Sequence, residues 1–295
     1  GSGGPLPVVV AVAQGGKDRF LANRSQQIAE LLSDGVAVCL PDVRGTGETA
    51  AEPEPSDDSE RRRLAEREFS LGSTLLGAQR KDLRTVLAYL AGRADLNRER
   101  IAVWGDSFAP ANPRHLFLDE LQWEASPHIQ YRAEPLGAHL ALLAGLYEEH
   151  VSAVAAQGGL AAYLSLLDDA FTYVPMDAVL PRVLKVGDVA DIASALAPRP
   201  LLLEGCVSGR NVPLTAAELE PALAMVRRAY GQSGAADRLM VRVGPSPPTV
   251  AAWLRAWLQQ GPRNGMPGAG ARRGPEAARR PAPVAGHTNA QARGL

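Results

Sequence analysis

Six short apolar runs that alternate with helical patterns constrain the fold of this chain more than any other feature. The runs lie at residues 7–13, 36–40, 101–104, 151–156, 200–203 and 239–243. The helical patterns lie at 22–32, twice within 61–90, and at 138–147, 217–230 and 250–258. Continuous apolar strands that alternate with helices are typical of a parallel sheet with both faces covered. The sequence therefore predicts an α/β fold with a mostly parallel central sheet.

The composition of the chain limits the classes of partner that it is expected to bind. The chain has 295 residues, 46% of them hydrophobic, so it can bury a large core, and its net charge of −1 argues against a nucleic-acid partner. No apolar run approaches the roughly 18 residues of a membrane span, and no signal peptide opens the chain. We therefore expect a soluble chain with no membrane partner. Cys39 and Cys206 lie in or beside apolar runs and are predicted to be buried thiols, not a disulfide or a metal site.

The third apolar run ends in Gly105-Asp106-Ser107-Phe108-Ala109. A serine on a sharp turn directly after a buried strand is how the G-x-S-x-G elbow exposes a nucleophile. Small residues around the serine let strand and helix approach closely, and Ala109 replaces the second glycine. We predict that Ser107 is a nucleophile; the alternative is a serine in an ordinary strand-to-helix turn.

Two backbone N–H groups are candidates for an oxyanion hole. Gly15 follows the first apolar run, and Phe108 follows the serine, which are the two places from which such donors come. We expect no cofactor or metal. The pattern Gly45-x-Gly47-x-x-Ala50 fits a dinucleotide fingerprint, but acidic, Pro-rich sequence follows it where a helix is required.

These motifs resemble those of the α/β-hydrolase superfamily, of the acetyl xylan esterase and dienelactone hydrolase kind. The four segments that carry the resemblance are Gln14-Gly15-Gly16, Asp42-Val43-Arg44-Gly45-Thr46-Gly47, Gly105-Asp106-Ser107-Phe108 and Ala197-Pro198-Arg199-Pro200-Leu201-Leu202-Leu203. The resemblance covers residues 7–258. It implies an α/β-hydrolase-like three-layer sandwich, whose first two strands would lie before residue 1, and a serine-dependent hydrolysis of esters.

The resemblance also implies a domain organisation. Residues 1–260 would form the α/β-hydrolase-like domain, with a cap-like region at 161–196. Residues 109–136 would be an insertion after the elbow, because the sequence from Gly137 onward looks like the helix that usually follows the serine directly. Residues 261–295, rich in Pro, Gly, Ala and Arg, are predicted to be a disordered tail.

In this fold an acid follows the fifth run and a histidine follows the sixth. The family's aspartate would fall near Ser208, and Glu204 is the nearest carboxylate, so it is the candidate acid. The loop at 244–249 contains no histidine. The candidate bases are therefore His128 and His115, both within the insertion.

Two functions follow from these residues. The first is a serine carboxylic-ester hydrolase that acts on a small-molecule or carbohydrate ester. The second is a degenerate hydrolase domain, catalytically weak or inactive, that binds a ligand or forms a module of a larger protein. The serine turn and the glycine loop favour the first. The missing loop histidine favours the second, because a serine without a base is a poor nucleophile.

Overall fold

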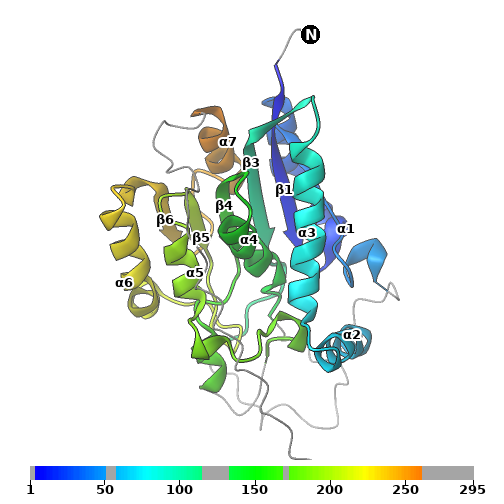
Figure 1. The fold of residues 1–295 in the computed structure, drawn as a ribbon. Helices are drawn as coiled ribbons and strands as arrows, with labels where there is room; N and C mark the ends of the chain where they lie inside the picture. The colour runs from blue at the N-terminus through cyan, green and yellow to red at the C-terminus, as the bar shows by residue number, and fades with distance from the viewer. Residues whose placement is uncertain (1–3, 51–57, 115–132, 169–172, 261–295) are drawn as a thin grey trace, which may run out of the picture. The chain divides into compact units, whose positions relative to one another are not determined.

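The computed structural model describes residues 4–50, 58–114, 133–168 and 173–260. Within these ranges one six-stranded sheet has the order β2-β1-β3-β4-β5-β6, and every neighbouring pair is parallel (Figure 1). The strands are β1 (Leu6–Ala13), β2 (Ala37–Cys39), β3 (Leu96–Asp106), β4 (Val151–Gln157), β5 (Leu201–Glu204) and β6 (Leu239–Arg242). The sheet confirms the predicted α/β fold.

Helices cover both faces of the sheet. They are α1 (Gly16–Ser33), α2 (Asp58–Ser70), α3 (Leu75–Ala91), α4 (Leu136–Tyr147), α5 (Val189–Ala195), α6 (Ala216–Gln232) and α7 (Val250–Gln260). Side chains of α1 and α7 pack in one apolar cluster, and those of α3, α4, α5 and α6 pack in another on the opposite face (Figure 1). The result is the three-layer arrangement that the sequence predicts.

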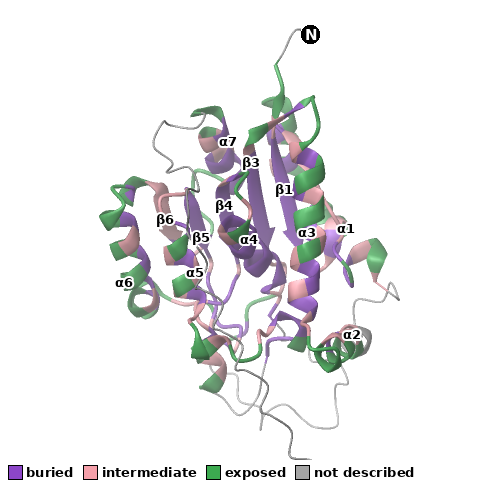
Figure 2. Cartoon of the chain, viewed as in Figure 1, coloured by how far each residue is buried: buried purple, intermediate pink, exposed green. Residues whose placement is uncertain are grey.

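The strand residues explain why both faces need cover. In β1, Val8, Val10 and Val12 belong to one apolar cluster, whereas Val9 and Ala11 belong to the other. Successive side chains of a strand point to opposite faces, so a continuous apolar run makes both faces apolar. The central strands are accordingly buried throughout their apolar runs (Figure 2).

Two elements are longer than predicted. Helix α1 begins at Gly16, six residues before the predicted start, because the carboxylate of Asp42 accepts a hydrogen bond from the N–H of Lys17 (2.8 Å). That contact joins residues 25 positions apart in the chain, so no local pattern predicts it. Strand β3 begins at Leu96, before the apolar run. The sequence pattern does not predict this extension, because residues 97–100 are polar and partly or fully exposed.

Several sequence predictions concern other parts of the chain. The cap-like region at 161–196 contains α5 and three 3-10 turns among its described residues, and its role as a cap stays a prediction. The tail at 261–295 and residues 115–132 of the insertion lie outside the described residues.

Both cysteines are free; Cys206 is buried as predicted, but Cys39 is only half-buried. In the described ranges no helix combines the length and apolar character that crossing a membrane requires.

Candidate active site

Ser107 follows β3 at the C-terminal edge of the sheet, on a turn that packs against the start of α4. A Cβ atom on Gly105 would collide with the backbone of Gly137, so the strand and the helix touch through glycines. The side chain of Ser107 lies against Gly158, where an added Cβ would be 3.1 Å from the Ser107 Oγ. No described residue forms a hydrogen bond with the Ser107 hydroxyl.

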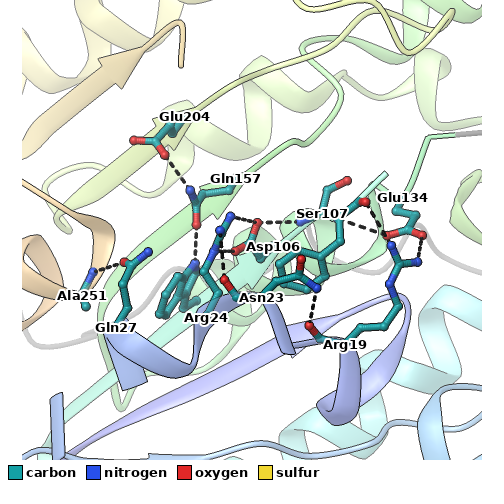
Figure 3. A network of polar contacts seen from close by, with 12 residues as sticks. Arg19, Asn23, Arg24, Gln27, Asp106, Ser107, Glu134, Gln157, Glu204 and Ala251 are labelled. Atoms are coloured by element: carbon teal, nitrogen blue, oxygen red, sulfur yellow. Dashed lines mark hydrogen bonds and ion pairs between the residues drawn. The ribbon is translucent and has the colours of Figure 1, made fainter. Parts of the chain in front are cut away.

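The residue before the serine fixes the turn from the strand side. The buried carboxylate of Asp106 accepts hydrogen bonds from the Ser107 N–H (2.8 Å) and from Arg24 Nε (2.7 Å) (Figure 3). Burial raises the pKa of Asp106, and the Arg24 guanidinium opposes that rise. The pair therefore anchors the turn to α1.

After the turn, the chain does not continue directly into a helix. The backbone N–H of Asn112 donates to the carbonyl of Asn211 (2.9 Å), and the Asn211 side chain donates to the carbonyl of Pro110 (2.8 Å). These contacts tie the exit from the turn to the loop after β5. Helix α4 begins only at Leu136.

The candidate acid, Glu204, is held by two other side chains. Gln157 Nε2 donates to Glu204 Oε1 (2.6 Å), and Arg242 Nη1 donates to Glu204 Oε2 (3.1 Å). Gln157 also accepts a hydrogen bond from Trp104 Nε1 (2.6 Å), so the polar chain crosses from β3 to β6. Figure 3 shows its link between Gln157 and Glu204. No hydrogen bond joins Glu204 to Ser107 within the described ranges.

The loop after β6, where the fold would supply a histidine, is organised by an arginine. Arg242 Nη1 donates to the carbonyls of Ser246 and Pro248, each at 2.6 Å. Glu204 and Arg242 therefore form a buried ion pair at the strand ends from which a triad acid and base would come. An arginine stays protonated in proteins and cannot act as that base.

The histidines are placed as follows. His139 is buried in α4, stacks on Tyr163, and has its pKa lowered by burial to about 4. No hydrogen bond joins it to Ser107 in the described part of the chain, and His150 lies in the turn after α4. His115 and His128, the predicted bases, lie outside the described residues.

The predicted oxyanion donor Phe108 already has a partner. Its N–H donates to Glu134 Oε2 (3.1 Å), and the other Glu134 oxygen is paired with Arg19 Nη1 (2.5 Å) (Figure 3). Gly15, the other predicted donor, is the residue before α1, and Arg19 covers it.

Sequence reasoning missed Arg19, Glu134, Gln157 and Arg242. One signal was available for Arg242, a charged residue at the end of an apolar strand run next to the loop without histidine. The others have no local signal, because their partners come from distant parts of the chain. In the described part of the chain, no group of three or more acidic, histidine or cysteine side chains could hold a metal ion.

No family model matches the chain, and no curated protein matches its sequence. Among solved structures, a Bacteroides fragilis protein with a provisional assignment as an acetyl xylan esterase aligns with a TM-score of 0.59. The two are 16% identical over 81% of this chain, which spans only 59% of that protein's length.

Two further structures have TM-scores of 0.50. One is a promiscuous esterase of carbohydrate esterase family 15 from a marine bacterial metagenome, 14% identical, covering 88% of this chain and 74% of its own. The other is the catalytic domain of a glucuronoyl esterase from Hypocrea jecorina, 15% identical, covering 88% and 67%. Likeness at these identities shows a shared fold.

Proposed function

We propose that this chain, which has the α/β-hydrolase fold, is a carboxylic-ester hydrolase with Ser107 as its nucleophile. The observation that carries the proposal is the position of Ser107, on a glycine-packed turn at the carboxyl end of β3. Ligands of open parallel sheets bind beyond the carboxyl ends of the strands. The esterases among the structural neighbours support an ester substrate, and the assignment of one of them as an acetyl xylan esterase favours an acyl ester of a carbohydrate.

The proposed reaction follows the acyl-enzyme route. Ser107 Oγ attacks the ester carbonyl carbon while its proton passes to an imidazole base, and the N–H groups of Phe108 and Gly15 hold the oxyanion. Collapse of the intermediate expels the alcohol, which takes that proton. Water then attacks the acyl-serine and gives a proton to the imidazole, which returns it to Ser107 Oγ as the carboxylic acid leaves.

His128 or His115 supplies the base in this proposal, since neither His139 nor His150 forms a hydrogen bond with Ser107. Glu204 was the predicted acid, but the proposed mechanism does not use it. Its two oxygens accept hydrogen bonds from Gln157 and Arg242, which already hold the carboxylate between β4 and β6.

Hydrolysis of p-nitrophenyl acetate by wild type, Ser107→Ala, His115→Ala and His128→Ala tests the proposal. We expect Ser107→Ala to lose all activity above background and one histidine variant to lose about 10²-fold or more, as removal of a general base does. A control that leaves the site intact is Asp95→Ala, which removes only an exposed pair with Arg93. Equal rates for wild type and Ser107→Ala would overturn the proposal.

A second candidate is a catalytically silent hydrolase fold that serves as a binding or structural module. The buried pair of Glu204 and Arg242 favours it, because this pair stands where an acid and a histidine would be expected. In that case wild type and Ser107→Ala hydrolyse the ester at the same background rate, and both bind the same ligand.

A further inference from the structure

The backbone of Phe108 is enclosed by one ion pair. Its N–H donates to Glu134 Oε2 (3.1 Å), and its carbonyl accepts from Arg19 Nη2 (3.0 Å). Between them, Arg19 Nη1 bonds to Glu134 Oε1 (2.5 Å). The three hydrogen bonds close a ring on the residue that follows Ser107 (Figure 3).

The same ion pair covers the second proposed oxyanion donor. An added Cβ on Gly15 would collide with the side chain of Arg19, so that side chain lies directly over Gly15. The guanidinium of Arg19 also lies 5.9 Å from the centre of the Phe108 ring. Glu134 is held mostly away from water, with 15% of its side chain exposed, and Arg19 is 39% exposed.

The Glu134 carboxylate accepts hydrogen bonds from a backbone N–H and a guanidinium, so it is chemically equivalent to a small anion bound at these donors. Hydrogen bonds from an N–H and a guanidinium to such an oxygen are among the stronger ones in proteins. Glu134 therefore occupies donors suited to the oxyanion of an ester or to the carboxylate that ester hydrolysis releases. Glu134 belongs to the chain itself, so the donor set is complete without a ligand.

We propose that the Phe108 N–H and the Arg19 guanidinium form a seat for a small carboxylate, which Glu134 fills. Glu134 leaves the seat before an ester can react at Ser107. The binding of a carboxylate needs only the contacts described above. The step at Ser107 rests on the proposed function.

Binding of sodium acetate, followed through the amide resonance of Phe108 by NMR, tests the seat. In Glu134→Ala the Phe108 amide is expected to shift saturably with acetate, with an affinity at least about tenfold above that of wild type, because the competing carboxylate is gone. Adding Arg19→Met to that variant is expected to weaken acetate binding by about tenfold, because it removes the charged donor.

Asp95→Ala is the matched control, because it also removes one carboxylate from an ion pair with an arginine, and Asp95 directly precedes β3 whereas Ser107 follows its other end. It is expected to bind acetate no better than wild type. Glu134→Gln keeps the size of the side chain without its charge and replaces Glu134→Ala if that variant does not fold. Acetate affinity equal to wild type in a folded, neutral Glu134 variant would overturn the seat.

Ester hydrolysis by the same variants separates this proposal from the proposed function. If both hold, Glu134→Ala hydrolyses p-nitrophenyl acetate about tenfold faster than wild type, and Ser107→Ala abolishes the gain. If acetate binds at Phe108 and the rate stays at background, the seat stands and the hydrolase proposal fails. A faster reaction without acetate binding at Phe108 would overturn the seat alone.

Discussion

The Ser107 side chain fits in its position because the neighbouring residue, Gly158, has no Cβ atom. Gly158, at the end of β4, has φ +62, and an added Cβ would lie 2.5 Å from the Cβ of Ser107. Any side chain at this position would displace the serine or its turn. Gly158 therefore sets the place of the Ser107 hydroxyl as directly as the strand that carries it.

Replacing Gly158 with alanine is expected to cost about 2–4 kcal/mol of unfolding free energy, from the left-handed backbone and the overlap with Ser107. Gly35→Ala is the matched control, because Gly35 has φ +74 but no atom within 4 Å of an added Cβ. It should cost only the backbone part, about 1 kcal/mol. Urea unfolding of both variants measures the difference, and equal losses would contradict the close packing at Ser107.

His139 gives a second prediction for a single residue. Burial lowers its pKa from 6.5 to about 4, so the unfolded chain binds a proton between these pH values and the folded chain does not. Folding stability should therefore fall as the pH drops through that window, by about 2–3 kcal/mol from this group. His139→Phe keeps an aromatic ring on Tyr163 but cannot bind a proton. The free energy of unfolding in urea, measured from pH 7.5 to 4.5, should therefore depend less on pH in this variant than in wild type. Parallel pH profiles for both proteins would contradict it.

At the scale of elements, the ends of the parallel strands are joined by side chains. Trp104, Gln157, Glu204 and Arg242 form a continuous polar chain across the ends of β3, β4, β5 and β6. Glu204 and Arg242 are both buried, with side chains 4% and 8% exposed. These hydrogen bonds fix the spacing of the strand ends around Ser107. They also engage Glu204, the carboxylate that the sequence suggests as the catalytic acid.

Removing one member of the Glu204–Arg242 ion pair should lower the free energy of unfolding strongly. Arg242→Met leaves Glu204 buried without its counterion, so we expect a loss of about 3–5 kcal/mol in unfolding free energy. Combining it with Glu204→Gln should cost less than the sum of the single changes, because no charge is then left alone. The exposed pair of Arg93 and Asp95 is the control, with an expected coupling below about 1 kcal/mol. Additive losses at Glu204 and Arg242 would mean that the pair does not couple β5 to β6.

For the whole molecule, the sequence predicts the layers well because they depend on local patterns. Six apolar runs and the helices between them give the order of elements, and Ser107 follows the third run as predicted. The surroundings of Ser107 depend on pairs that no local pattern relates. Arg19 and Glu134 are 115 positions apart, and Gln157 and Glu204 are 47 apart. Such pairs become visible only once the sheet brings the strand ends together.

The same contrast explains what happened to the predicted site residues. Glu204 is the carboxylate nearest to the position near Ser208 where the resemblance places an acid, and the structure has it as the last residue of β5. Its partners could not be predicted, because Arg242 lies inside the predicted apolar run at 239–243 and no local pattern relates it to Glu204. Phe108 was likewise chosen for its place after Ser107, while the carboxylate on its N–H comes from 26 residues further along the chain.

Covalent labelling of Ser107 tests the central claim, that this serine is a reactive nucleophile, most directly. Wild type and Glu134→Ala would be treated with a fluorophosphonate and mapped by peptide mass spectrometry. We predict one adduct, on Ser107, that forms faster in Glu134→Ala and is absent from Ser107→Ala. Failure of both proteins to label, under conditions that label a known serine esterase completely, would contradict the claim.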